Sequence, residues 1–236
     1  MQLSKRLQTV ADLVTPGNRV ADVGCDHAYT SIYLAKQKIS PYIIAMDINQ
    51  GPLDRAEENI IKYQCEELIE VRKSDGLKKL MPDEADTIII AGMGGGLTFQ
   101  ILSECMEIVK TTKELILQPQ SEIFKVRQLL TNYNFIIINE NMIKDEGKYY
   151  VIIKAIPLAD VDNVAPYQLI RKEHFYHGRL LLEQKNKILE EYLIWDLNIC
   201  DDILKTLEDG KSDSSLQRKN EIQERIDLNR AGLAYY

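Results

Sequence analysis

"ADVGCDHAY", residues 21–29, follows a short apolar run and precedes a helical pattern. A strand that leads through a glycine turn into a helix is the context of a nucleotide-binding loop. Gly24 permits the turn, but Asp26 stands where a dinucleotide loop has its second glycine. A carboxylate there repels a diphosphate, whereas Asp22 and Asp26 favour a ligand with ammonium and sulfonium charges. The loop therefore favours S-adenosylmethionine, and the alternative is an ordinary turn with a helix-capping aspartate.

Short apolar runs alternate with helical patterns as far as residue 120. Several of these runs are continuously apolar, as strands buried on both faces of a parallel sheet should be. Repeated strand–helix units predict a doubly wound parallel sheet. The runs span residues 19–23, 42–47, 68–72, 87–91 and 115–117.

Residues 135–156, "FIIINENMIKDEGKYYVIIKAI", contain two β-rich runs around "KDEGK". They predict an antiparallel hairpin with its turn at Glu146-Gly147. Five parallel strands followed by a hairpin give the strand count of a seven-stranded mixed sheet. We therefore expect a Rossmann-like α/β domain over residues 1–160.

The remainder of the chain, residues 161–236, has a helical character. Apolar residues recur at steps of three and four over residues 167–207, and "EDGKSDSS" (208–215) interrupts the pattern. Ser214 and Gln217 are spaced as a capping box for a second helix. Two amphipathic helices with a short break predict an antiparallel helical hairpin of coiled-coil type.

The composition narrows the class of protein. A net charge of −7 argues against indiscriminate nucleic-acid binding, although it leaves room for a local basic patch. The four cysteines form no CxxC pair, so neither a zinc site nor a disulfide framework is expected. Free thiols suit a reducing cytosol. No apolar run approaches the roughly 20 residues of a membrane span. We expect a cytoplasmic protein without a metal site.

Polar residues follow the second and third apolar runs. Asp47 lies 23 residues after Gly24 and could accept both hydroxyl protons of a ribose, or else cap the following helix. "SDG" (74–76) could hydrogen-bond an adenine amine and ring edge, but it is also a common turn sequence. These residues favour an adenosine ligand without selecting among adenosine cofactors.

The fourth and fifth runs end in further candidate segments. "IIIAGMGGG" (88–96) runs from a buried strand into four glycines, which let the backbone approach a flat group closely. Carbonyls of Ala91 or Gly92 could accept a proton from an exocyclic amine; the alternative is a flexible loop. In "LQPQ" (117–120), the amides of Gln118 and Gln120 suit a base edge, although most such tetrapeptides are plain turns.

Together these segments resemble a known family. "LSKRLQTVADLV", "ADVGCDHAY", "DGL", "IIIAGMGGG", "LILQPQ" and "DEGKYYVII" have the order and spacing of the bacterial tRNA adenine-N1 methyltransferases that modify adenosine 22, the TrmK family. The resemblance covers residues 1–157 closely and the helical tail more loosely. It implies a class I methyltransferase domain, then a coiled-coil domain that assists tRNA binding. The chain departs from the usual pattern at Cys25, often serine, and at Gln120, often asparagine.

The resemblance implies S-adenosylmethionine as methyl donor, N1 of a tRNA adenine as acceptor, and the following sites. The cofactor would contact Asp22, Gly24, Cys25, Asp26, His27, Asp47, Ser74, Asp75, Gly76, Ala91, Gly92 and Met93. Expected substrate contacts are Lys5, Arg6, Tyr29, Gly94, Gly95, Gln118, Pro119, Gln120, Arg171 and Lys172. Direct participation in catalysis is expected of Asp26, Gly92 and Gln118.

Three alternatives to this function stay open from the residues alone. The protein could methylate a small molecule or a protein side chain instead of RNA. It could be a non-catalytic RNA-binding or scaffolding module that works through its helical hairpin. It could be an NAD-dependent oxidoreductase, which Asp26 disfavours. A monomer is the expected state.

Overall fold

The computed structural model describes residues 1–207 and 212–236. The chain forms two compact units, Met1–Pro166 and Tyr167–Tyr236. The boundary between them thus falls at Pro166, whereas the sequence suggested residue 160.

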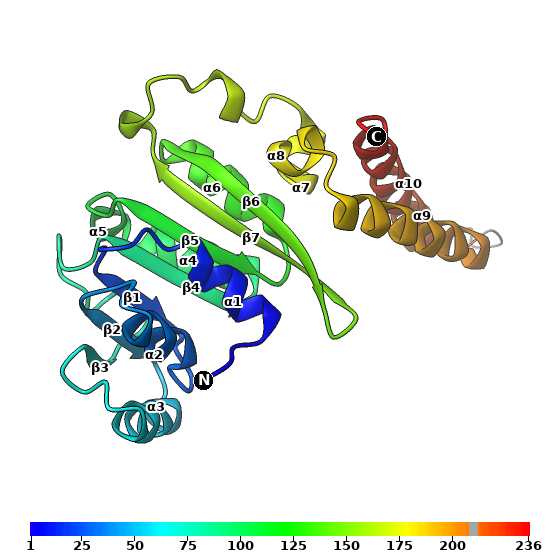
Figure 1. Ribbon diagram of the computed structural model, residues 1–236. Coiled ribbons are helices and arrows are strands. Elements are labelled where there is room, and N and C mark those ends of the chain that lie inside the picture. The colour runs from blue at the N-terminus through cyan, green and yellow to red at the C-terminus, as the bar shows by residue number, and fades with distance from the viewer. Residues whose placement is uncertain (208–211) are drawn as a thin grey trace. The chain divides into compact units, whose positions relative to one another are not determined.

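The first unit is built on a seven-stranded sheet with strand order β3-β2-β1-β4-β5-β7-β6 (Figure 1). Strands β1 to β5 are mutually parallel, and β7 runs antiparallel to both β5 and β6. This confirms the predicted mixed sheet, with each expected strand within two residues of its predicted start. The strands are β1 (Val20–Val23), β2 (Ile43–Asp47), β3 (Ile69–Lys73), β4 (Thr87–Met93), β5 (Glu114–Pro119), β6 (Phe135–Asp145) and β7 (Lys148–Pro157).

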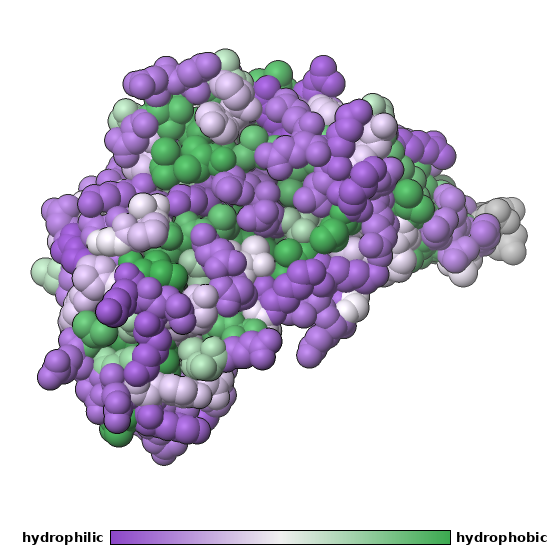
Figure 2. Space-filling view, in the orientation of Figure 1, coloured by the Kyte–Doolittle hydropathy of each residue, from purple (hydrophilic) through white to green (hydrophobic). Residues whose placement is uncertain are grey.

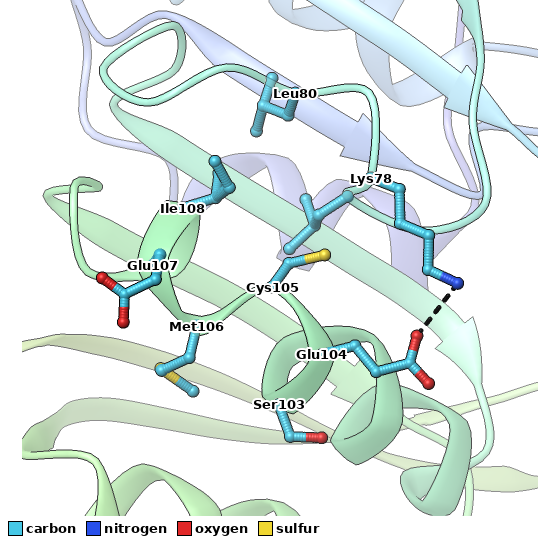
Figure 3. Close-up of a pocket in the computed structure, with 9 residues that line it drawn as sticks. Lys78, Leu80, Ser103, Glu104, Cys105, Met106, Glu107 and Ile108 are labelled. Carbon is cyan, nitrogen blue, oxygen red and sulfur yellow. Dashed lines mark ion pairs between the residues drawn. The ribbon is translucent and has the colours of Figure 1, made fainter.

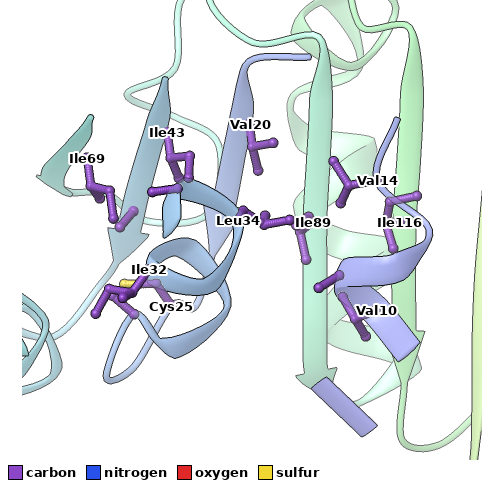
Figure 4. Packing of buried hydrophobic residues seen from close by; sticks show 14 of the residues in the cluster. Val10, Val14, Val20, Cys25, Ile32, Leu34, Ile43, Ile69, Ile89 and Ile116 are labelled. Atoms are coloured by element: carbon purple, nitrogen blue, oxygen red, sulfur yellow. The ribbon is translucent and has the colours of Figure 1, made fainter. Parts of the chain in front are cut away.

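Helices cover both faces of this sheet (Figure 1). Apolar residues of α1, α2 and α3 join those of the strands in one core on the first face; Ile32 and Leu34 of α2, for example, lie among strand residues such as Ile43 and Ile89 (Figure 4). Helices α4 and α6 pack together on the other face. The helices are α1 (Lys5–Asp12), α2 (Tyr29–Lys36), α3 (Gln50–Lys62), α4 (Gly95–Glu104), α5 (Met106–Val109) and α6 (Ile123–Asn132), followed by 3₁₀ turns at Leu158–Asp160 and Ala165–Tyr167.

The hairpin between β6 and β7 turns where the sequence predicts. Glu146 and Gly147 have φ values of 47° and 77°, and Asp145 pairs with Lys148 across the turn. Two consecutive positive φ values are what a tight hairpin of the favoured hand requires. Because β7 is antiparallel to β5, this turn lies at the edge where the parallel strands end, which is the ligand-binding edge of open α/β sheets.

In its described residues, 167–207 and 212–236, the second unit contains four helices: α7 (Lys172–His177), α8 (Arg179–Glu183), α9 (Lys187–Leu207) and α10 (Asp213–Leu233). The continuous apolar pattern from residue 167 hides two breaks. Gly178 has φ of 88° between α7 and α8. Asn186 then starts α9, because its side-chain oxygen accepts hydrogen bonds from the amides of Ile188 and Leu189.

Helices α9 and α10 form the predicted antiparallel hairpin. Asp196 accepts hydrogen bonds from Arg225 and Asn229, while Cys200, further along α9, packs against Ile222, earlier in α10. The predicted capping box is wrong in position. Ser212 caps α10, since its hydroxyl accepts from the Ser215 amide at 3.2 Å. Residues 208–211 of the predicted break lie outside the described residues.

Hydrophilic side chains predominate on the face shown in Figure 2, with smaller hydrophobic areas between them. Across residues 1–207 and 212–236, no helix has the length and apolar character needed to cross a membrane.

Candidate active site at the carboxyl edge of the sheet

The loop between β1 and α2 is folded back on β2 through its backbone. The amides of Gly24 and Cys25 both donate to the Met46 carbonyl, at 2.8 and 3.0 Å. Gly24 has φ of 74°, and a Cβ there would lie 2.2 Å from the Met93 methyl carbon. Glycine therefore allows the Met93 side chain to lie against this loop, which joins it to the glycine-rich segment after β4.

Three carboxylates act on the centre of this loop. Asp22 is buried, and burial raises its pKa to about 6 although a 2.6 Å hydrogen bond from Ser31 opposes the shift. Burial also raises the pKa of the Cys25 thiol, and the charges of Asp22, Asp47 and Asp26 raise it further. The loop is therefore a region of negative potential that a cationic ligand would neutralise.

The Asp26 carboxylate has a partner within the protein. Its Oδ1 atom lies 3.2 Å from a guanidinium nitrogen of Arg55, and its Oδ2 atom lies 3.6 Å from His27 Nε2. Asn59 donates to the His27 carbonyl at 3.1 Å. Helix α3 thus holds the outer side of the loop through Arg55 and Asn59. Sequence reasoning missed both, because they lie about 30 residues away along the chain.

Asp47 ends β2 at the same edge. Its carboxylate accepts from the Asn49 amide at 2.9 Å, and Asn49 is the N-cap of α3. The helix-cap alternative for Asp47 is therefore wrong. The next residue, Ile48, is 54% exposed and offers apolar surface beside the carboxylate. Ile48 was not predicted from the sequence, although its position directly after a candidate ribose ligand is the signal that could have identified it.

The "SDG" turn uses its polar side chains internally. The Ser74 hydroxyl donates to the Gly76 carbonyl at 2.8 Å and accepts from the Lys79 amide. Asp75 pairs with Lys78 at 2.5 Å, and Lys78 also lies 3.2 Å from Glu104. The Ser74 side chain is therefore occupied within the turn, whereas the Asp75 carboxylate, 58% exposed, is shared with Lys78.

A pocket of about 460 Å³ lies beside this turn, where α4 gives way to α5 (Figure 3). The Lys78–Glu104 ion pair lies at its rim, and apolar side chains such as Leu80 and Ile108 project into it. None of the predicted site residues lines it. Its lining is Leu77, Lys78, Leu80, Ser103, Glu104, Cys105, Met106, Glu107 and Ile108.

The glycines at the end of β4 and directly after it have two different environments. At Gly95 a Cβ would lie 2.2 Å from the Ser121 carbonyl oxygen, and the Gly95 amide donates to that oxygen at 2.9 Å. Gly94 is also close to Ser121, whose hydroxyl would be 3.2 Å from an added Cβ. Gly92, with φ of 83°, faces side chains instead. Gly95 therefore serves the packing of two loops, and Gly92 is the more open position.

Arg6 of α1 reaches this open position. A Cβ on Gly92 would lie 3.4 Å from Arg6 Nη1 and 3.8 Å from Gln120 Nε2. Arg6 Nη1 donates to the Gln118 side-chain oxygen at 2.8 Å. Gln118 is completely buried and Pro119 is buried beside it, whereas Gln120 is exposed. Arg6, expected on the basic surface, thus lies inside the site, and its guanidinium has the side-chain oxygen of Gln118 as partner.

Aromatic rings and a second cation complete this edge. The rings of His27 and Tyr29 stack with centroids 5.4 Å apart and an interplanar angle of 16°. Tyr29 is 38% exposed at the start of α2, so part of this residue is accessible at the edge. Lys5 is exposed and donates to the Lys144 carbonyl at 3.3 Å, next to the hairpin turn.

The remaining predicted substrate contacts, Arg171 and Lys172, belong to the second unit. Arg171 lies 3.8 Å from Glu173, and Lys172 pairs with Glu224. Among the residues that the structure describes, no group of three His, Cys, Asp or Glu side chains could hold a metal ion.

The chain is similar to known methyltransferases over most of its length. Residues 3–153 match the family described as "Methyltransferase domain". The chain is 31% identical to the tRNA (adenine(22)-N(1))-methyltransferase of Bacillus subtilis (strain 168), over 97% of this chain and 95% of the relative. The chain belongs to the TrmK family of tRNA methyltransferases.

Solved TrmK structures agree with this assignment along the whole chain. The crystal structure of the B. subtilis M1A22 tRNA methyltransferase TrmK has a TM-score of 0.88 and 30% identity, covering 98% of this chain and 99% of its own. A putative tRNA (m1A22) methyltransferase of Streptococcus pneumoniae, in complex with S-adenosyl-L-methionine, has a TM-score of 0.84 and 27% identity, covering 98% and 100%.

Proposed function

We propose that this protein transfers a methyl group from S-adenosylmethionine to N1 of adenine 22 in tRNA. The observation that carries the proposal is the likeness to the B. subtilis enzyme over nearly the full length of both chains. Membership of a methyltransferase family removes the oxidoreductase alternative. A scaffold with a degenerate pocket is disfavoured, because the Gly24 turn is in place and the carboxylates of Asp47 and Asp75 stand where β2 and β3 end.

The residues of the first unit fit this cofactor. The buried Asp22 carboxyl and the carboxylates around Cys25 suit a ligand with positive charges and no phosphate. We propose that Asp47 holds the ribose hydroxyls and that Ile48 and the turn at residues 74–76 flank the adenine. Gly24, Cys25, His27 and the segment from Ala91 to Met93 would line the rest of the cofactor site.

The reaction needs little acid–base chemistry. Bound S-adenosylmethionine supplies an activated methyl group. The N1 lone pair of adenine forms the new N–C bond, the S–C bond breaks with its electron pair going to sulfur, and S-adenosylhomocysteine leaves. Positive charge passes from sulfur to the adenine ring, and no proton has to move. Positioning and exclusion of water can therefore supply most of the rate enhancement.

We propose positioning roles for the residues around Gly92. Carbonyls of Ala91 and Gly92 would accept hydrogen bonds from the adenine amine, and Tyr29 would offer its exposed part to the ring. N1 takes part in base pairing or lies within the tRNA fold, so the base must be extruded to reach this edge. Gly94 and Gly95 shape the loop, while Asp26 shares its charge with Arg55.

Contacts with the rest of the tRNA are proposed for basic side chains of both units. Lys5 is exposed at the site edge, and Arg171 and Lys172 precede or begin α7. We further propose that the protein acts as a monomer in the cytoplasm.

The test is to incubate the protein with methyl-labelled S-adenosylmethionine and unmodified tRNA, digest the tRNA and identify the labelled nucleoside. The expected product is N1-methyladenosine at position 22. A matched tRNA with guanosine at position 22 should receive no label. Label in another nucleoside, or in a protein or small molecule only, would overturn the proposal.

A further inference from the structure

We infer that Arg6 binds the phosphate of the extruded adenosine inside the active site, and that Gln118 is the residue that positions Arg6. This inference rests on the proposed function, because it assigns the part of the tRNA that meets the open position at Gly92. It also gives Gln118 a role different from the contact with a base edge that the sequence suggests.

Arg6 is fixed in place by contacts from three strands. Its backbone amide donates to Asp145 Oδ2 at 3.1 Å, which ties the first turn of α1 to the end of β6. Its guanidinium carbon lies 5.7 Å from the centre of the Tyr150 ring on β7. Gln118 on β5 accepts from Nη1 at 2.8 Å. The guanidinium is thus preorganised at the carboxyl edge, close to Gly92.

Among the residues that the structure describes, no carboxylate forms an ion pair with the Arg6 guanidinium. Residues 1–166, all of which the structure describes, contain five arginines. Arg19, Arg55, Arg72 and Arg127 each form an ion pair with a carboxylate. The guanidinium of Arg6 has the Gln118 side-chain oxygen and the Tyr150 ring as its partners instead. A fixed arginine with neutral partners keeps its charge available for an anion, whereas the other four arginines of the unit are paired with carboxylates.

The chemistry of the reactants identifies that anion. The methyl donor is a cation, and the adenine gains positive charge during transfer, so a guanidinium directed at either would oppose the reaction. The phosphate is the anionic part of the extruded nucleotide. Arg6 Nη1 and Gln120 Nε2 both face Gly92, so two donors converge where phosphate oxygens could accept them.

Gln118 acts through Arg6 in this arrangement. It is completely buried, its side-chain oxygen is taken by Arg6, and its amide nitrogen has a weak contact of 3.4 Å with the Pro119 carbonyl. Because this buried amide cannot move freely, the hydrogen bond to its oxygen holds the Arg6 guanidinium in one orientation. Its replacement should matter only as long as Arg6 is present.

The experiment compares four variants with the wild-type protein: Arg6→Ala, Arg6→Lys, Gln118→Met and the double variant Arg6→Ala/Gln118→Met. Lys110→Ala is the control, since Lys110 is an exposed cation before the amino end of β5. For each protein we would measure kcat/KM for tRNA methylation, the salt dependence of tRNA binding, and the Kd for S-adenosylmethionine.

Arg6→Ala should lower kcat/KM for tRNA about 10- to 100-fold, as expected for loss of charge-assisted hydrogen bonds. It should reduce the salt slope of tRNA binding by about 1, and Lys110→Ala should do neither. Arg6→Lys should restore the slope but little of kcat/KM, because an ammonium lacks the planar fork. Gln118→Met should lower kcat/KM alone and have no further effect in the double variant. All the variants should bind S-adenosylmethionine like the wild type.

Other results would overturn the inference. If Arg6→Ala has the salt slope and kcat/KM of Lys110→Ala, Arg6 does not bind a phosphate. If Gln118→Met keeps its full effect in the double variant, Gln118 contacts the substrate itself. If Arg6→Ala weakens cofactor binding tenfold, Arg6 acts on the cofactor. A wild-type protein whose tRNA binding depends on Arg6 but which transfers no methyl group would overturn the proposed function and support the phosphate contact.

Discussion

Buried charged groups have different partners at the two ends of the parallel strands. At the edge where the parallel strands begin, Asp86 pairs with Arg19 at 2.9 Å and Glu114 pairs with Lys154 at 2.8 Å. At the edge where they end, the buried Asp22 has a hydroxyl partner, Ser31. The pKa values follow this difference. Arg19 holds the pKa of Asp86 well below its usual range, whereas burial raises the pKa of Asp22 to about 6.

This difference separates stability from function within one sheet. Charges at the amino edge are paired, so they hold strand ends together and are unavailable to ligands. Within the described part of the chain, the side chains of Asp22 and Arg6 at the carboxyl edge lack oppositely charged side-chain partners. The folded protein therefore carries an electrostatic cost there that ligands can remove. Substitutions at the two edges should therefore change stability in opposite directions.

The largest effect is expected from breaking the paired edge with Glu114→Gln. Glu114 is buried and accepts from Thr15, Thr87 and Lys154, so its loss leaves the Lys154 ammonium without a counter-charge. The free energy of unfolding should fall by about 3 kcal/mol, measured by urea denaturation. Glu107→Gln, at a glutamate with 91% side-chain exposure, should leave it unchanged. Equal stabilities of the two variants would contradict the importance of the paired edge.

Asp22→Asn should have the opposite sign. Folded Asp22 titrates near pH 6 against an ordinary value of 3.8, so the folded state binds the extra proton between these values. Stability attributable to Asp22 therefore falls as the pH rises from about 4 to 6, by up to about 3 kcal/mol. At pH 8 the variant should be more stable than the wild type, and at pH 4 the gain should vanish. A destabilised variant at pH 8 would contradict the unpaired state of Asp22.

The protonation of Asp22 should also change the affinity for the cofactor. If the Asp22 carboxylate attracts the cationic cofactor, the affinity for S-adenosylmethionine should fall by up to tenfold per pH unit below about pH 6. Titration calorimetry between pH 5 and 8 would measure it. The Asp22→Asn protein should bind more weakly at pH 8 and show a flatter profile. An identical profile in both proteins would remove Asp22 from the cofactor site.

The smallest effect on stability is expected from Asp26→Ala. Its ion pair with Arg55 is exposed on both sides, with 60% and 46% of the side chains accessible. Such pairs contribute under about 1 kcal/mol, so the denaturation midpoint should hardly move. Methylation kinetics then isolate any chemical role. A fall in kcat of more than tenfold in a protein of normal stability would assign Asp26 to the transfer step, and an unchanged kcat would exclude it.

Local sequence patterns predicted the sheet because each strand and turn is determined within a few residues. Continuous apolar runs mark strands buried on both faces, and Glu146-Gly147 has the turn chemistry its backbone needs. The carboxyl ends of parallel strands lie at one edge of the sheet. Candidate site segments that follow these strands therefore come together once the sheet is predicted.

The partners of the site side chains could not be predicted in this way. Arg6 meets Gln118 across 112 positions of the chain and Asp145 across 139, and no local pattern records such contacts. The pairing of Asp75 with Lys78 is local, but the sequence does not reveal whether a carboxylate faces a ligand or a neighbour. In the second unit, helical periodicity continued across Gly178, where the backbone turns.

Cys25 gives the proposed cofactor loop, between β1 and α2, a chemical reporter. The thiol is buried in the loop, and its pKa is raised by burial and by nearby carboxylates, so it should resist alkylation while the loop is closed. Its modification rate would then measure how often the loop opens. The amides of Gly24 and Cys25 both donate to one carbonyl of β2, that of Met46. Loss of these two hydrogen bonds in one local opening would expose the sulfur. A bound cofactor should slow that opening, and a thiol reagent could follow occupancy without any methyl transfer.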